Sequence, residues 1–167
     1  MSEQCKATIG ITRGDQAGIG PEVVAAALAS GELSAAFKYE LIGEVVDAVP
    51  GQPSAKTAKA ALDALEEAVE MLESGRIDAV VTAPVGKEGL HDLGFYFPGQ
   101  TEFFAERLGC DNHAMCLTGK TTKQTETLCR YIYRKSQTSI LTKLVIFEVF
   151  SKILWKIITY YLYIINH

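Results

Sequence analysis

The sequence lacks the features that mark several large classes of protein. Its four cysteines form no Cys-x-x-Cys pair and it has only three histidines, which argues against a zinc-finger framework. No charged segment followed by an apolar core opens the chain, so we expect no signal peptide and a cytoplasmic protein with reduced thiols. The net charge of −4 argues against non-specific nucleic-acid binding. With 48% hydrophobic and 22% charged residues, the composition excludes disorder and low-complexity structure.

Three residue types are missing altogether from the last part of the chain. Residues 120–167 contain no glycine, proline or alanine, whereas residues 1–119 contain all 14 glycines and all 5 prolines. The charges differ as well, with 8 Lys and Arg against 18 Asp and Glu in residues 1–119, and 8 against 2 in residues 120–167. We therefore predict two units, an α/β unit over residues 1–119 and an unrelated basic and apolar tail over residues 120–167.

Short apolar runs alternate with helical patterns in the first unit. The clearest helix is 54–74, in which apolar residues recur at helical spacing between Ser54, a suitable N-cap, and Gly75, a suitable stop. Strands are expected at residues 7–12, 37–42, 77–82 and 114–117, and further helices after Pro21 and near residues 101–108. Strand, helix and strand in this order predict a mostly parallel sheet with flanking helices.

A glycine-rich loop follows the first predicted strand. Gly14, Asp15, Gly18 and Gly20 lie between that strand and a helix, where backbone N–H groups can approach an anion or a polar substrate. The alternative is a tight turn in which Asp15 caps the backbone. On the residues alone, the two interpretations stay open.

Two more loops follow later strands. Lys87 ends the loop after the strand at 77–82, where an ammonium group can meet a phosphate or carboxylate, or remain in solvent. Gln100 and Thr101 lie at the start of the helix near 101–108, where Thr101 can also serve as the N-cap. Because the three loops converge on one sheet edge, we expect a pocket there. His91 and His113 are isolated, so we assign no metal site and no catalytic residue.

At these loops the sequence resembles a known family. The segments ITRGDQAGIGPEVV, DAVVTAPVGKEGL and FPGQTEFFAERLG are similar to three ordered blocks of the 4-hydroxythreonine-4-phosphate dehydrogenase family of pyridoxal phosphate biosynthesis. The resemblance covers residues 6–118. It implies the two-lobed α/β fold of isocitrate and isopropylmalate dehydrogenases, and a homodimer. It also implies oxidation of a phosphorylated hydroxy-amino acid with NAD or NADP and a divalent metal held by three histidines.

The resemblance also implies which residues contact the substrate. The family's His-Thr pair falls on Gln100 and Thr101, so only the threonine matches, and the family's lysine falls on Lys87. The family's metal-binding histidines and most cofactor contacts lie beyond the third block, where this chain changes character. We therefore predict a truncated, inactive form that binds neither metal nor nicotinamide. The alternative is a module that binds a small phosphorylated anion without catalysis.

The tail allows three interpretations. Residues 140–165 are strongly apolar but interrupted by charges, and a helix would place Glu148, Lys152 and Lys156 on one face. The segment can be interpreted as a membrane span of low hydrophobicity, as an amphipathic helix that binds a membrane surface or a partner, or as out-of-frame sequence. The absence of alanine, glycine and proline favours the third interpretation.

Overall fold

The fold is built around a small parallel sheet. The computed structural model describes residues 7–110, 116–117, 146–148 and 159–160. Its four-stranded sheet has the order β2-β1-β3-β5, and every neighbouring pair is parallel. In that order the strands are Lys38–Ile42, Thr8–Thr12, Ala79–Thr82 and Ile146–Glu148.

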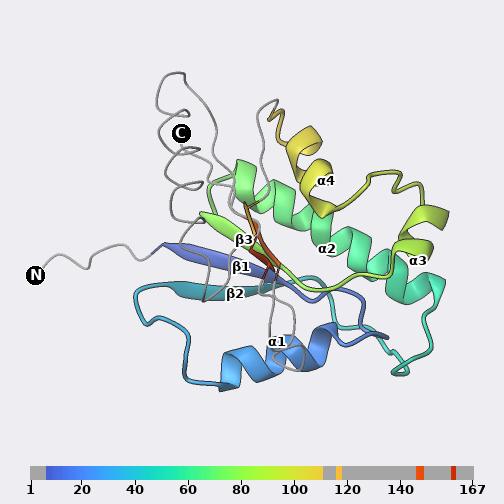
Figure 1. Cartoon of the computed structure of the whole chain (residues 1–167), viewed down its shortest axis with the longest axis horizontal. Helices are drawn as coiled ribbons and strands as arrows, with labels where there is room; N and C mark the ends of the chain where they lie inside the picture. Colours follow the sequence, from blue (N-terminus) through green and yellow to red (C-terminus); the bar gives the residue numbers. More distant parts are fainter. Residues whose placement is uncertain (1–6, 111–115, 118–145, 149–158, 161–167) are drawn as a thin grey trace, which may run out of the picture.

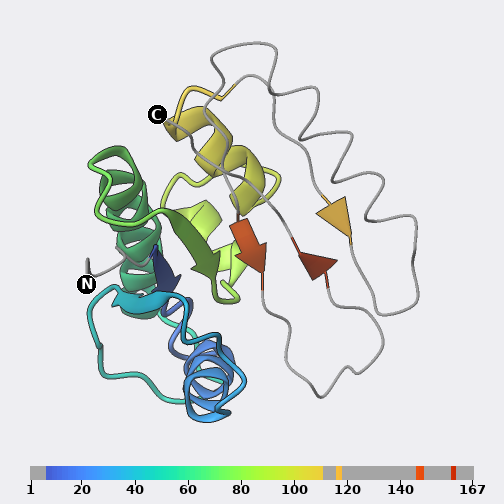
Figure 2. The same ribbon diagram turned by 90° about the vertical axis from the view of Figure 1, so that its left-hand side faces the viewer.

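Helices cover both faces of this sheet. Helices α2 (Ala55–Glu73), α3 (Lys87–Asp92) and α4 (Gln100–Arg107) lie on one side, and α1 (Gly20–Ala29) lies on the other (Figure 1). A separate antiparallel pair, β4 (Cys116–Leu117) with β6 (Thr159–Tyr160), lies beyond β5 (Figure 2). The predicted α/β fold, with a parallel sheet and flanking helices, is confirmed.

Helix α2 forms the centre of the core. Ser54 is its N-cap, and Ser54 and Thr57 form a reciprocal capping box, which satisfies backbone N–H groups that a helix start leaves open. The apolar face of the helix is buried against the sheet and against the aromatic residues of α4, which are completely buried. The main members of this core are Ile42, Leu65, Val69, Leu72, Ile77, Val80, Leu90, Phe103 and Phe104. The helix therefore forms where its apolar periodicity predicts.

Helix α1 packs more loosely. Its predicted apolar face includes Val23, Val24 and Ala27, which are only partly buried, and Leu28, which is 39% exposed. Only Gly20 is buried in this helix. The side of the sheet that carries α1 is therefore less protected from water than the side that carries α2.

The structure differs from the predicted elements in two places. Residues 87–92 form α3, a helix that the sequence did not predict; of the predicted loop 83–87, only its last residue, Lys87, belongs to this helix. The described pieces of the tail, Ile146–Glu148 and Thr159–Tyr160, are strands, although the spacing of the tail's charges suits a helix. The rest of the tail, including most of residues 140–165, lies outside the described residues. In the described part of the chain, no helix has the length and apolar character needed to cross a membrane.

Candidate functional site

The loops after β1 and β3 are joined at the carboxyl edge of the sheet. Parallel strands end at the same edge, so the loops that follow them meet there. The backbone N–H of Ala83 donates to Thr12 Oγ1 at 3.1 Å. The N–H of Asp15 donates to the carbonyl oxygen of Pro84 at 2.9 Å. Both bonds join the glycine-rich loop to the loop that carries Lys87.

The close approach of the two loops requires glycine at two positions. Gly14 has φ +66°, and a Cβ atom there would lie 2.4 Å from the Pro84 oxygen. A Cβ atom on Gly86 would lie 2.9 Å from Asp15 Oδ2. Any larger residue at either position would push the loops apart, so these glycines fix the spacing of the site.

Asp15 uses its carboxylate locally. The residue is 8% exposed, and its Oδ1 accepts a hydrogen bond from the N–H of Ala17 at 3.0 Å. Its carbonyl oxygen accepts from the N–H of Gly18 at 3.0 Å. Gly20, the first residue of α1, packs closely against the carbonyl oxygen of Arg13. These bonds form the capped turn that was the alternative interpretation of the sequence. Contact between Asp15 and a ligand remains a proposal.

The sequence interpretation missed a second connection of this loop. Arg13 Nε donates to the carbonyl oxygen of Gly43 at 3.0 Å. Gln16 donates through Nε2 to the Glu44 carbonyl at 2.6 Å and accepts at Oε1 from the N–H of Val46 at 3.0 Å. These side chains join the glycine-rich loop to the segment that follows β2. A long-range side chain to backbone pairing leaves no local pattern, so the sequence carried no signal for it.

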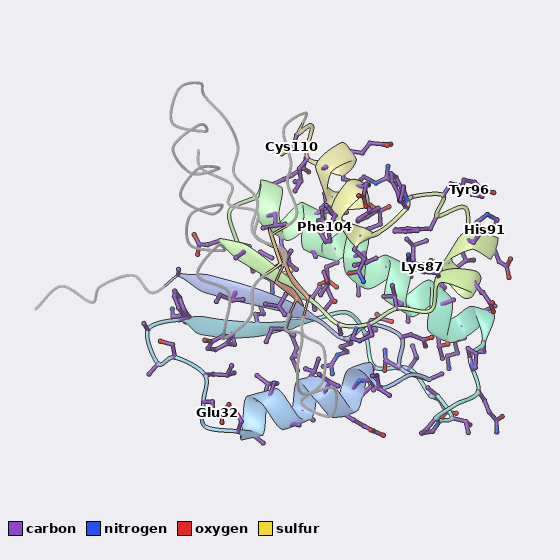
Figure 3. The ribbon with its side chains drawn as sticks, in the orientation of Figure 1. Glu32, Lys87, His91, Tyr96, Phe104 and Cys110 are labelled. Atoms are coloured by element: carbon purple, nitrogen blue, oxygen red, sulfur yellow. The ribbon has the colours of Figure 1, made fainter. Side chains whose placement is uncertain are left out.

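Lys87 reaches the third loop. Its Nζ donates to the carbonyl oxygen of Pro98 at 2.9 Å, two residues before Gln100. Lys87 itself is exposed, and Figure 3 shows it on the same side of the molecule as His91 and Tyr96. The structure therefore brings the second and third loops together, as the sequence predicted for loops that share one edge.

Gln100 and Thr101 open helix α4. The N-cap of this helix is Gly99, so the interpretation of Thr101 as N-cap is wrong. Thr101 is the second helical residue and is 6% exposed. It lies two residues after the N-cap position, because the helix begins at Gln100.

Two buried oxygen atoms have no hydrogen-bond partner among the described residues. They are Thr82 Oγ1, at the carboxyl end of β3, and Gln100 Oε1, at the start of α4. Buried polar atoms normally have partners, and those without them mark places where a water molecule or a ligand group belongs. Both atoms lie on elements that end or begin at the candidate site.

An ion pair attaches α4 to α2 behind the site. Arg107 Nε and Nη2 both donate to the carboxylate of Glu66, the shorter contact being 2.7 Å. The hydrogen bonds that Arg107 donates to the Glu66 carboxylate raise the pKa of Arg107. The guanidinium also lies over the rings of Phe97 and Phe103, at 5.9 and 5.3 Å from their centroids. These contacts hold the helix that carries Gln100 and Thr101.

The described residues contain no cluster of metal-binding side chains. Nowhere in residues 7–110 and the short described strands do three or more His, Cys, Asp or Glu side chains come together as metal ligands. The described residues therefore do not by themselves supply a set of three such ligands for a divalent metal.

Together these features define an α/β protein with a cluster of linked loops at the carboxyl edge of a parallel sheet. The family model of the pyridoxal phosphate biosynthetic protein PdxA matches residues 13–149. The chain belongs to this family. The match runs past residue 119, so it includes 30 residues of the segment predicted to be an unrelated tail, and the boundary at 119 remains a prediction.

Individual relatives agree with the family model. The chain is 31% identical to a 4-hydroxythreonine-4-phosphate dehydrogenase of Zymomonas mobilis, over 83% of this chain and 52% of that protein. It is 29% identical to a D-threonate 4-phosphate dehydrogenase of Pectobacterium atrosepticum, over 65% of this chain and 46% of that one. A crystal structure of a 4-hydroxythreonine-4-phosphate dehydrogenase from Burkholderia phymatum is similar with TM-score 0.55 and 31% identity, over 68% and 46% of the two chains. The chain spans about half the length of the curated relatives it matches.

Proposed function

We propose that this chain acts in pyridoxal phosphate biosynthesis and binds a phosphorylated hydroxy-amino acid at the linked loops. The observation that carries the proposal is the set of bonds from Asp15 to Pro84 and from Lys87 to Pro98, because they hold three separate loops in one place. The names of the relatives supply the substrate class: they act on 4-hydroxythreonine 4-phosphate or D-threonate 4-phosphate. Pairing with a second copy belongs to the same proposal and rests on the resemblance. A cytoplasmic location also belongs to it and rests on the sequence pattern described above.

The chemistry of the loops suits such a ligand. The ammonium group of Lys87 can donate to a phosphate or carboxylate oxygen, since one of its three N–H groups bonds to Pro98. Gln100 Oε1 is buried without a partner and accepts from a hydroxyl or ammonium group. Thr101, which follows it, and the backbone of Gly14, Gly18 and Gly20 complete the proposed site.

The proposal is confined to binding. The resemblance implies a nicotinamide cofactor and a divalent metal for the oxidation. The described residues offer no group of metal ligands, so no step of the proposal passes through a metal. We propose that this chain holds the substrate without oxidising it, which also fits a module that binds a phosphorylated anion.

Calorimetric titration of the full chain tests the proposal. The ligands are 4-hydroxythreonine 4-phosphate and D-threonate 4-phosphate, and at least one is expected to bind. Lys87→Met should weaken that binding by about tenfold or more, because a charge-assisted hydrogen bond is lost. Lys56→Met is the matched control, since Lys56 is an exposed lysine at the start of α2. No binding of either ligand, or equal binding by the Lys87→Met variant, contradicts the proposal.

A turnover assay separates binding from catalysis. The full chain is mixed with either ligand, NAD or NADP, and Mg²⁺ or Mn²⁺, and formation of reduced cofactor is followed by absorbance. We expect binding without reduced cofactor. Its formation would show that residues beyond those described supply the catalytic groups, and would overturn the binding-only part of the proposal.

A further inference from the structure

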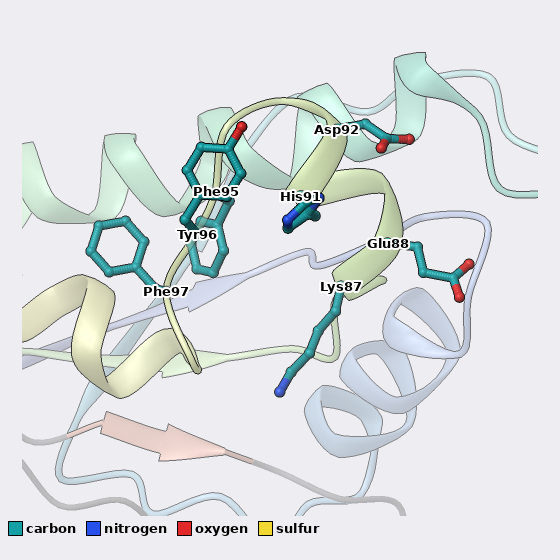
Figure 4. Close-up of a pocket in the computed structure, with 7 residues that line it drawn as sticks. All are labelled: Lys87, Glu88, His91, Asp92, Phe95, Tyr96 and Phe97. Atoms are coloured by element: carbon teal, nitrogen blue, oxygen red, sulfur yellow. The ribbon is translucent and has the colours of Figure 1, made fainter.

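A concave surface lies beside the linked loops, between α3 and the aromatic segment 95–97. It is a pocket of about 420 Å³, which is within the range of small-molecule sites. One wall is helix α3, and the other is the aromatic segment 95–97 (Figure 4). The proposed function does not use this aromatic wall, because a phosphorylated hydroxy-amino acid has no ring to place against it.

The aromatic wall is only partly explained by core packing. Phe95 is buried and packs against Phe97 and Phe103, with ring centroids 5.0 and 5.3 Å away. Tyr96 is 74% exposed, and its ring meets the ring of His91 edge to face at 4.9 Å. The first contacts stabilise the fold. The contact between Tyr96 and His91 leaves most of the Tyr96 ring in water, where its face can pack against another ring.

The charges around the pocket are arranged unevenly. His91 lies on the side of α3 that faces the aromatic segment, and Lys87 extends from the start of α3 toward Pro98 (Figure 4). Glu88 and Asp92 also line the pocket but point away from the aromatic rings. Lys87 Nζ donates to the Pro98 carbonyl, which leaves two N–H groups of a cation at the edge of the aromatic wall. The pocket therefore combines an aromatic surface with one cationic donor, Lys87, and has two carboxylates on its opposite side.

We propose that this pocket binds a planar aromatic ring that carries an anionic group. The ring packs against Tyr96 and His91, and the anionic group accepts hydrogen bonds from Lys87. Neither half of the pocket suffices by itself, because an exposed lysine binds a free anion weakly in water and a single exposed ring binds an apolar molecule weakly. The ligand class follows from having both within one pocket.

Titration of the full chain with three simple probes tests this inference. The probes are phenyl phosphate, inorganic phosphate and phenol, followed by ligand-observed NMR. Phenyl phosphate is expected to bind at least several-fold more tightly than either of the others, because it alone has both groups. Phenyl phosphate that binds no better than inorganic phosphate would overturn the inference.

A pair of variants locates the site. Tyr96→Ser should weaken phenyl phosphate binding by about two- to tenfold, the effect of losing one aromatic contact, and should leave inorganic phosphate unchanged. The variant is expected to fold, because the ring is mostly exposed. Phe37→Ser is the matched control, since Phe37 is 41% exposed and lies between α1 and β2, outside the pocket. Equal weakening by both variants, or by neither, contradicts the assignment.

The two proposals share Lys87 and are separable. Tyr96→Ser is expected to leave binding of the phosphorylated hydroxy-amino acids unchanged. Loss of phenyl phosphate binding alone would remove the aromatic site and keep the proposed function. If the chain binds phenyl phosphate but neither hydroxy-acid phosphate, the proposed function is overturned and the aromatic site is kept.

Discussion

At the scale of single residues, two buried threonines at the ends of neighbouring strands have opposite environments. Thr12 Oγ1 accepts from the N–H of Ala83, whereas Thr82 Oγ1 has no partner, and both side chains are at most 1% exposed. Losing an accepted bond leaves a buried N–H unsatisfied. Removing a buried hydroxyl that has no partner costs no hydrogen bond, and it also removes the free-energy cost of taking that hydroxyl out of water.

Valine has nearly the same shape as threonine, so we expect the two threonine-to-valine substitutions to change the free energy of unfolding differently. Thr12→Val should lower the free energy of unfolding by about 1–3 kcal/mol, and Thr82→Val should leave it unchanged or raise it. Urea denaturation measures both. A loss at Thr82 as large as that at Thr12 would mean that the Thr82 hydroxyl has a partner, such as a bound water molecule.

Asp15 gives a second prediction at this scale. Asp15→Ala removes the acceptor for the Ala17 N–H and should lower the free energy of unfolding by about 1–2 kcal/mol. Asp15→Asn keeps an acceptor oxygen and should lose less. Asp47→Ala, at an exposed carboxylate, is the control. If Asp47→Ala lowers the urea midpoint as much as Asp15→Ala does, the Asp15 carboxylate does not stabilise the turn.

At the scale of elements, the contact between α2 and α4 depends on the pair formed by Arg107 and Glu66. Both side chains are about two-fifths exposed, at 42% and 39%. Solvent therefore screens the pair, and we expect a coupling energy of about 0.5–1 kcal/mol from a double-mutant cycle with Arg107→Gln and Glu66→Gln. The more exposed pair of Lys59 and Asp63 should couple less.

The pH dependence of this pair has a definite sign. Glu66 raises the pKa of Arg107, so the folded state holds the proton more tightly than the unfolded state does. Arg107 is therefore a cation at every pH below the ordinary arginine range and loses its proton only in strong alkali. At neutral pH, high salt should weaken the coupling. A coupling energy that is the same in 1 M salt would contradict this account.

The elements show which parts of the fold the sequence can predict. Helix α2 follows from a long apolar stripe with a capping serine, since both signals are local. Helix α3 was missed because Lys87–Asp92 has six residues, a glycine inside it and one buried apolar side chain, Leu90. Strand β5 was missed because its pairing partner, β3, is more than sixty residues away.

The candidate site also has a part that the sequence predicts and a part that it does not. That the loops after β1 and β3 would meet follows from parallel strands ending at one edge, and the structure places Asp15 against Pro84. The bonds from Lys87 to Pro98 and from Gln16 to the segment after β2 depend on tertiary packing. No spacing in the sequence encodes them. The roles of Gln100 and Thr101 toward a ligand remain predictions.

At the scale of the whole molecule, exposed apolar side chains gather around α1 and β2. Large apolar residues there remain more than a third exposed, and they come from α1, β2 and the loops beside them. They are Ile19, Leu28, Leu33, Phe37, Leu41, Val45 and Val49. We expect this surface to make the chain self-associate as its concentration rises.

Sedimentation measures this self-association. Leu28→Ser combined with Phe37→Ser should reduce it and change the free energy of unfolding by no more than about 0.5 kcal/mol, since neither side chain belongs to the core. Val80→Ser, at a fully buried position of β3, is the contrasting control and should be strongly destabilising. Unchanged self-association in the double variant would show that other surfaces are responsible.

The position of β5 has a consequence for the order in which the chain folds. Strand β1 pairs with β2 across about thirty residues, whereas Thr82 of β3 pairs with Glu148. Closing the longer loop costs more entropy and waits until that segment leaves the ribosome. Until then one edge of β3 has unpaired backbone groups, which can pair with the same edge of another nascent chain. Slow synthesis between residues 82 and 146 should therefore favour aggregation during expression.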